Sequence, residues 1–103
     1  MIKKRKYDAS SIFTKRIKKL KGSDLSNLFN KLDEILSCED IDHYKNLRHP
    51  LNKFKRVHIN KSFVILFFGN DGSVYFVNYL HHDIVYKNAN KTLEKYSDLF
   101  FDE

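Results

Sequence analysis

One apolar run limits the folds open to this chain more than any other feature. Residues 63–68 read FVILFF, and Asn70-Asp71-Gly72 follows almost immediately. An apolar run of this length is typical of a strand buried on both faces, and an Asn-Asp-Gly sequence favours a hairpin turn. Residues 74–81 supply the returning strand. The sequence therefore predicts a buried β-hairpin at the centre of the fold.

The residues before this run predict a third strand in the same sheet. Val57 and Ile59 alternate with Phe54, Arg56 and His58, which places the two groups on opposite faces. Asn60-Lys61 is expected to turn the chain into the central strand. The three strands together predict an antiparallel β-meander.

Two-residue turns at 60–61 and 71–72 give an expected register. His58 then pairs with Phe63, and Phe63 pairs with Leu80. His58 and His82 share one face in this register. A bulge of one residue would break the arrangement. The other face, where we expect the helices, holds Val57, Ile59, Val64, Leu66, Phe68, Val77 and Tyr79.

Two short helices are predicted before the sheet. From Ser10 or Ser11 as N-cap, apolar residues recur with helical spacing to Leu20, and Gly22 stands where a helix ends in the left-handed conformation. Ser23 is expected to cap the second helix. Because the connection is short, we expect the two helices to pack antiparallel as a hairpin. The apolar positions of the second helix are Leu25, Leu28, Phe29, Leu32, Ile35 and Leu36.

Smaller elements complete the predicted fold. Residues 3–8 predict a short polar edge strand, residues 38–52 a loop, and the apolar spacing within residues 93–100 a short C-terminal helix. We therefore expect one α+β domain over residues 1–103. It consists of an N-terminal strand, a two-helix hairpin packed on an antiparallel β-meander, and the short C-terminal helix.

Positive charge is concentrated in two parts of the chain. Residues 1–22 carry nine basic residues and one acid, and residues 43–61 carry six basic residues and no acid. The segment between them, residues 23–42, has a net charge of −5. This distribution favours a surface that faces a polyanion. Ordinary surface lysine is the simpler alternative, since basic charge alone implies only salt-dependent, non-specific affinity for nucleic acid.

The compartment is expected to be the cytoplasm. Cys38 is the only cysteine, so an intrachain disulfide is impossible and a reducing environment is the simpler assumption. The basic N-terminus is not followed by the apolar segment of a signal peptide, and residues 63–68 are too few to cross a bilayer. We expect no membrane association.

The histidines give the basic surface a possible chemistry. Four of the five lie between His49 and His82, among lysines and arginines. Metal-free RNA cleavage requires a base for the ribose 2′-hydroxyl, an acid for the leaving 5′-oxygen, and cations for the phosphorane. Two histidines of opposite protonation can provide the base and the acid near neutral pH.

Several short motifs resemble the RelE/YafQ superfamily of toxins, and the YafQ branch above all. They are HPL at residues 49–51, VHI at residues 57–59, the apolar strand that follows, and His-x-x-x-aromatic from His82 to Tyr86. The order of the predicted elements agrees. The resemblance implies the toxin of a type II toxin-antitoxin system, a ribosome-dependent endoribonuclease that cuts mRNA without a metal or other cofactor. It also implies a cognate acidic antitoxin as partner, with the toxin monomeric or in a heterotetramer with that antitoxin.

The resemblance also assigns site residues. It implies that His49, His58 and His82 are catalytic and that Tyr86 lies near the scissile nucleotide. We expect His82 to be the general acid and His49 or His58 to be the base. Where the YafQ branch has an acidic residue after the VHI-like segment, this chain has Ser62. The residues expected to contact RNA are Arg48, Lys53, Lys55, Arg56 and Lys61.

Other interpretations stay open. A non-catalytic basic domain that binds RNA or the ribosome would use the same surface without the histidines, and a protein-interaction module would predict no toxicity. A zinc site built from Cys38, His43, His49 and the His81-His82 pair lacks CxxC and HxxxH spacing. Tyr86 could stack on a base or pack on the sheet. A stacking platform and an incompletely covered core are both compatible with the aromatic residues expected on the His58 face, which are Phe54, Phe63, Phe67 and Phe76.

Overall fold

The computed structural model describes residues 4–48, 51–70, 72–85 and 87. The predicted C-terminal helix, His49 and Tyr86 lie outside these residues. In the described part, the order of elements is the predicted one, with two short 3₁₀ helices (η) in addition. The elements are β1 (Lys6–Ala9), α1 (Ser11–Ile17), α2 (Gly22–Ser37), η1 (Ile41–His43), β2 (Lys55–His58), β3 (Phe63–Gly69), β4 (Ser73–His81) and η2 (His82–Ile84).

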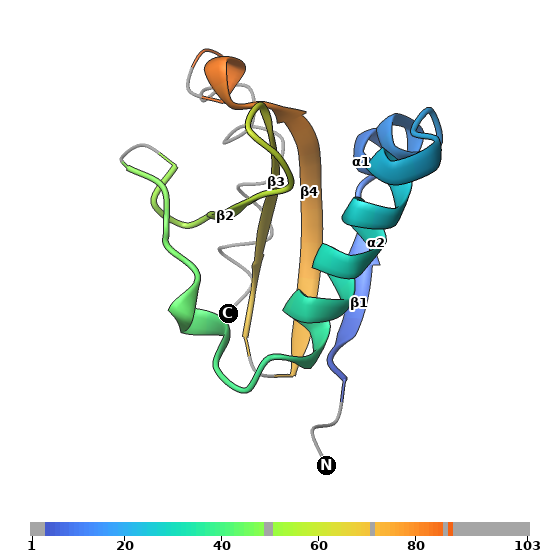
Figure 1. Cartoon of the computed structure of the whole chain (residues 1–103). Helices are drawn as coiled ribbons and strands as arrows, with labels where there is room; N and C mark the ends of the chain where they lie inside the picture. Colours follow the sequence, from blue (N-terminus) through green and yellow to red (C-terminus); the bar gives the residue numbers. More distant parts are fainter. Residues whose placement is uncertain (1–3, 49–50, 71, 86, 88–103) are drawn as a thin grey trace.

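The strands of the described residues form one sheet in the order β1-β4-β3-β2. Strands β2, β3 and β4 make the predicted antiparallel meander. Strand β1 occupies an edge, as predicted, and runs parallel to β4 with Lys6 opposite Ser73. The sheet is therefore mixed, and both α1 and α2 lie on one side of it (Figure 1). The predicted α+β architecture is confirmed.

Ser10 begins α1 by the mechanism that the sequence predicts. Its side-chain oxygen accepts a hydrogen bond from the backbone N–H of Phe13 at 3.0 Å. A cap of this kind stabilises a helix by about 1 kcal/mol. The Ser10 hydroxyl also donates to the carbonyl of Val77 at 2.6 Å, so the cap fixes α1 to β4. Phe13 is buried on the sheet and stacks on Phe76 with ring centroids 5.5 Å apart.

The start of α2 differs from the prediction. Gly22 has a φ of 60°, as expected of a glycine between two helices, but α2 already begins at this residue. Ser23 is therefore not the N-cap, and Lys21 occupies that position without a side-chain capping bond among the described residues. Phe29 is 54% exposed because it lies at the edge of the apolar stripe whose centre is formed by Leu28 and Ile35.

Two apolar clusters fill the two faces of the sheet. The helix-side cluster includes Phe13, Leu28, Ile35, Ile65, Phe67, Phe76 and Tyr79. The cluster on the opposite side is covered by the connection between η1 and β2 and includes Leu47, Leu51, Phe54, Val64, Leu66, Val77, Leu80 and Val85. The residues 38–52, predicted to be a loop, therefore supply core side chains to both faces.

The predicted faces of β3 were wrong because the β2–β3 turn is one residue longer than expected. The N–H of Ile59 donates to Phe63, and the Asn60 side chain accepts from the N–H groups of Ser62 and Phe63. His58 therefore pairs with Val64 instead of Phe63. Val64 and Leu66 consequently lie on the side opposite the helices.

A bulge between β3 and β4 compensates for this shift. Phe68 pairs with Tyr75 as predicted, but the register changes between Leu66 and Phe67, and Phe63 pairs with His81 instead of Leu80. The bulge returns the end of β4 to the expected orientation, so His82 still lies on the His58 side. Val77 and Phe68, in contrast, do not face the helices. Phe63, Phe67 and Phe76 were expected on the His58 face but join the helix-side cluster, and Phe54 is fully buried on the other face. Of the two interpretations left open for these four residues, a shared stacking platform is therefore wrong.

Arg5 connects distant parts of the chain. Its guanidinium donates to the carbonyl oxygens of Ile35 at 3.2 Å and Cys38 at 2.6 Å, and to that of Asn70 at 3.1 Å. Its backbone N–H donates to Leu36. A buried cation at the C-terminus of α2 satisfies carbonyls that have no partner in the helix. Arg5 therefore ties the residue before β1 to α2 and to the β3–β4 turn.

Among the residues that the structure describes, none of the helices has the length and apolar character needed to traverse a lipid bilayer.

Candidate active site

The end of the sheet brings two of the predicted catalytic histidines together. His58 is the last residue of β2, and His82 follows the last residue of β4. Their ring centroids are 6.5 Å apart, and both side chains are accessible to solvent. His49, the third predicted catalytic histidine, and Tyr86 fall outside the described residues.

Asp83 lies beside this pair and was missed by sequence reasoning. Its Oδ1 atom is 3.0 Å from Nδ1 of His82, and its Oδ2 atom is 3.6 Å from Nδ1 of His81. The Asp83 N–H also donates to Nδ1 of His81 at 3.1 Å. The sequence motifs directed attention to position 62 as the place of a carboxylate. The adjacency of an acid to the His81-His82 pair is the signal in the sequence that could have revealed it.

Ser62 does lie next to the histidines. Its carbonyl accepts a hydrogen bond from the backbone N–H of His82 at 2.8 Å. The register shift between β3 and β4 thus brings Ser62 opposite His82. The position compared with the YafQ carboxylate is therefore close to the site, but its contact with His82 is made by the backbone.

Two arginines share a cavity with His82. The cavity, of about 280 Å³, is lined by Arg48, Arg56 and His82 together with apolar residues that include Val64 and Val85. Guanidinium groups bind phosphate oxygens through paired hydrogen bonds. The predicted RNA contacts Arg48 and Arg56 are thus next to the histidine pair.

The three predicted lysines have different surroundings. Lys61 is exposed in the β2–β3 turn, near the histidines. Lys55 is 6% exposed, and its ammonium contacts the Tyr44 carbonyl at 3.2 Å, the Asn46 side chain at 2.8 Å and the Asp42 carboxylate at 3.3 Å. A cation held in this way secures the loop from residue 42 to residue 46. The structure therefore does not present Lys55 as a phosphate contact.

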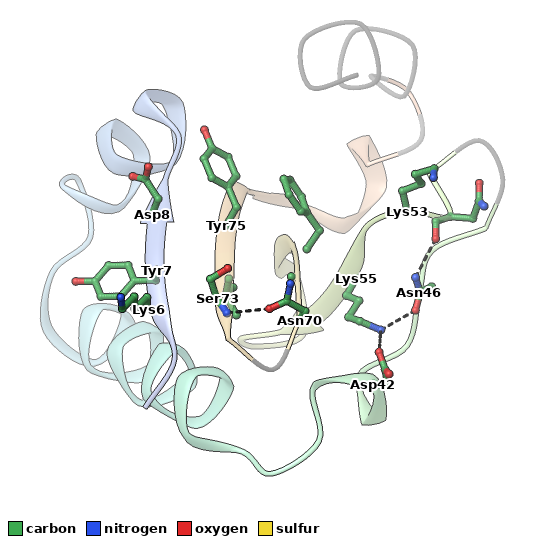
Figure 2. A pocket seen from close by; sticks show the side chains of 14 residues that line it. Lys6, Tyr7, Asp8, Asp42, Asn46, Lys53, Lys55, Asn70, Ser73 and Tyr75 are labelled. Carbon is green, nitrogen blue, oxygen red and sulfur yellow. Dashed lines mark hydrogen bonds and ion pairs between the residues drawn. The ribbon is translucent and has the colours of Figure 1, made fainter. Parts of the chain in front are cut away.

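Lys53 lines a second hollow, at the other end of the strands. This groove of about 720 Å³ lies between β1 and the loop that Lys55 secures, with Asn70, Ser73 and Tyr75 between them (Figure 2). Figure 2 also shows Lys55 bonded to Asn46 and Asp42. Lys53 precedes the first residue of β2 and His58 is the last, so Lys53 and the histidine pair lie at opposite ends of that short strand.

The electrostatic surroundings of His58 favour its neutral form. Partial burial lowers the pKa of His58 below its ordinary value of 6.5, and the positive charges of Arg56 and of a protonated His82 lower it further. A neutral imidazole carries a free lone pair and can accept a proton near neutral pH. His58 is therefore suited to act as a base.

The described residues that could approach a metal ion are His81, His82 and Asp83, whose ligand atoms lie within 4.8 Å of one another. The 3.0 Å between His82 and Asp83 is a hydrogen-bond distance, which makes this group an imidazole-carboxylate pair. Among the described residues, Cys38 and His43 do not join these groups as the possible zinc site would require. Cys38 contacts Arg5 and the Ile35 carbonyl, and His43 contacts the Asp40 carbonyl.

Comparison with known proteins relates the chain to bacterial and archaeal toxins. It is 47% identical over 74 residues to a Methanocaldococcus jannaschii protein named "Putative toxin RelE4". The aligned region covers 70% of this chain and 77% of that protein. The toxin-antitoxin complex RelBE2 of Mycobacterium tuberculosis contains a similar fold, with a TM-score of 0.62 and 17% identity over 80% of this chain and 98% of the matched chain. YafQ of E. coli matches with a TM-score of 0.56 and 13% identity, covering 80% of this chain and 98% of YafQ. No family model matches the sequence.

The fold and the sequence match to the M. jannaschii protein define the class of protein as the small RelE-type toxins. Within that class, the chain belongs to the RelE/YafQ superfamily.

Proposed function

We propose that this toxin is an endoribonuclease that cleaves mRNA on the ribosome and thereby inhibits translation. The observation that supports the proposal most is the pair of imidazoles 6.5 Å apart with a carboxylate beside one of them. A phosphodiester can lie between two such groups, with one imidazole near the attacking oxygen and the other near the leaving oxygen. Metal independence is carried over from the resemblance to the YafQ branch alone.

The reaction begins with proton transfer to His58. Its lowered pKa keeps the imidazole neutral, so it removes the proton of the ribose 2′-hydroxyl. The 2′-oxygen forms a bond to the adjacent phosphorus, and the bond from phosphorus to the 5′-oxygen breaks. His82 gives its proton to that leaving oxygen. The products are a 2′,3′-cyclic phosphate and a 5′-hydroxyl, with one proton gained by His58 and one lost by His82.

Asp83 is the positioning residue of this mechanism. Its Oδ1 atom lies 3.0 Å from Nδ1 of His82, within ion-pair distance of a protonated imidazole. In the proposed mechanism this contact favours a proton on Nδ1, so the other nitrogen, Nε2, is the one that exchanges a proton with the substrate. Asp83 thus supplies the carboxylate that Ser62 lacks.

Basic residues stabilise the phosphorane and hold the RNA strand. Arg56 and Arg48 line the cavity beside His82, and Lys61 lies in the adjacent turn. Cations placed where negative charge develops stabilise the transition state. His49 as an alternative base and Tyr86 as a stacking residue complete the proposal, and stacking on one base contributes about 1–3 kcal/mol.

The proposed partners are the ribosome with its mRNA and a cognate acidic antitoxin. The M. tuberculosis relative was solved as a toxin-antitoxin complex. We infer that the antitoxin of this chain covers the Arg56 and His58 face, in a heterotetramer or with a monomeric toxin. Translation takes place in the cytoplasm, which is therefore the proposed site of action.

Mapping of the cleaved ends tests the proposal. Purified toxin added to translating ribosomes should leave mRNA fragments with 2′,3′-cyclic phosphate and 5′-hydroxyl ends. The double variant His58→Ala/His82→Ala should still bind ribosomes but produce no fragments. A double variant that inhibits translation as strongly as the parent would instead identify a non-catalytic RNA- or ribosome-binding domain.

A further inference from the structure

A third cavity, referred to below as the cleft, lies beside His81 of the His81-His82 pair. It has a volume of about 540 Å³ and opens between the end of α1, the β2–β3 turn and the end of β4. Ligand sites in proteins commonly enclose about 300–1,000 Å³, so a nucleotide-sized molecule fits. Neither the acid–base mechanism nor the arginine cavity uses this cleft.

One wall of the cleft is aromatic and firmly supported. Phe63 is partly exposed and stacks on buried Tyr79, with ring centroids 5.1 Å apart and planes 4° from parallel. The imidazole of His81 packs edge-on against the Phe63 ring, with the ring centroids 5.5 Å apart. Arg16 donates to the carbonyl of Tyr79 at 3.0 Å, which fastens α1 to β4 at this point. The wall is therefore preformed, with Leu20 and Ile84 as apolar neighbours.

The rim of the cleft is basic. Arg16 and Lys19 come from α1 and the turn after it, inside the N-terminal segment that carries nine basic residues and one acid. Asn60 and Asp24 add hydrogen-bonding groups at the edge. A preformed aromatic wall below a cationic rim matches a nucleotide, because bases stack on aromatic rings and phosphates bind cations.

The cleft adjoins the proposed catalytic pair. His81 belongs to its wall, and the imidazole of His82 lies 4.6 Å from that of His81. We propose that this cleft is the subsite for the base of the nucleotide next to the scissile phosphate, an inference that rests on the proposed function. Lys19 then contacts the backbone phosphate that follows. An acidic peptide segment is the competing occupant, and it is less suited to the flat aromatic wall.

Cross-linking tests the position of the base. The probe is an mRNA of mapped cleavage position, with a 2′-deoxyribose at the cleaved nucleotide and 4-thiouridine at either neighbour. On programmed ribosomes, one of the two thiobases should cross-link to the peptide that contains Phe63 or the one that contains His81. Cross-links from both neighbours to residues around Arg48 and Arg56 would overturn the subsite, while cleavage of the unmodified message would leave the proposed function intact.

Variants of the cleft test the energetic role. Lys19→Ala should raise KM about tenfold with little change in kcat, because a phosphate contact contributes mainly to binding. Leu20→Trp, which narrows the cleft without changing its charge, should also raise KM. The matched control is Lys15→Ala, an exposed lysine of α1 that does not line the cleft. Equal KM values for Lys19→Ala and Lys15→Ala, in proteins with parental circular dichroism, would overturn the proposal. Protection of the cleft by the antitoxin but not by RNA would also overturn the proposal. It would identify an acidic peptide segment as the occupant of the cleft.

Discussion

The Nδ1 atom of His82 lies 3.0 Å from Oδ1 of Asp83, although the two residues are neighbours in the chain. Adjacent residues of a regular strand point to opposite faces, so this contact requires the backbone to leave the strand. The change of direction occurs between His81, the last residue of β4, and His82, where η2 begins. A short local turn therefore builds the imidazole-carboxylate pair, and the sheet then presents it to His58.

We expect His82→Ala to lose most of the activity. Removal of a general acid lowers a rate by about two to four orders of magnitude, whereas loss of an exposed histidine has little effect on stability. Single-turnover cleavage of mRNA on ribosomes measures the rate. His43→Ala is the matched control, because His43 is exposed on η1 and bonds only locally to Asp40 among the described residues. A folded His82→Ala protein that cleaves at the parental rate would remove His82 from the mechanism.

Asp83→Asn tests the positioning role separately. The amide has nearly the shape of the carboxylate but lacks its negative charge, so it holds the His82 imidazole in place less firmly. We expect kcat to fall by about one to two orders of magnitude with KM nearly unchanged. Asp83→Glu should recover part of the loss. If KM rises while kcat stays at the parental value, Asp83 contributes to RNA binding and not to proton transfer.

The pH dependence of cleavage should report His58. A base must be unprotonated, so kcat/KM should rise with pH through the pKa of His58, which lies below 6.5 because of burial and the charges of Arg56 and His82. Arg56→Ala removes one of these charges and should move both the acidic limb and the NMR titration of His58 towards higher pH. An acidic limb that does not follow the NMR titration would assign the base to another residue.

Alanine variants of Lys55 and Lys61 should distinguish a lysine that stabilises the fold from one that binds RNA. Lys55→Ala leaves the Asp42 carboxylate and the Tyr44 carbonyl without their cation and should lower the free energy of unfolding by about 1–3 kcal/mol. Lys61→Ala should leave stability nearly unchanged. In a binding series at several salt concentrations, it should weaken RNA affinity and flatten its salt dependence. The reverse pattern would show that Lys55 reaches the RNA.

The antitoxin should protect the face that carries Arg56 and His58 from hydrogen exchange. An acidic segment over Arg56 and His58 would associate quickly at low salt, and Arg56→Glu should slow association about tenfold under those conditions. Hydrogen exchange of the complex identifies the covered elements. Protection of α2 alone, with β2 and His82 exchanging as in the free toxin, would rule out direct occlusion of the histidines.

Local signals in the sequence predicted much of the fold. Ser10 caps α1 as expected, and the apolar run at residues 63–68 is the central strand. These elements were predictable because a cap and an apolar run depend on a few neighbouring residues. The parallel pairing of β1 with β4 had no such signal, since it depends on the placement of segments far apart in the chain.

The side-chain directions of β3 were predicted incorrectly because the lengths of turns are weakly encoded. One extra residue at Asn60 reversed them, and the bulge near Leu66 restored the orientation of His82. The prediction that His58 and His82 lie on one face was thus correct, although the register used to derive it was wrong in part. Lys55 was misassigned because the sequence cannot show that Asp42 and Asn46 fold over its ammonium group.

The parallel pairing of β1 with β4 also governs the order of events during biosynthesis. β1 is made first, but Lys6 lies opposite Ser73, and the Arg5 side chain needs the carbonyl of Asn70. A nascent chain therefore carries an unpaired first strand until β4 emerges, and contacts over so long a stretch of chain form slowly. His82 follows β4, so it joins His58 only after that strand is in place. On the proposed function, a newly made molecule has no assembled histidine pair until β4 is in place, and the proposed antitoxin can bind it during that interval.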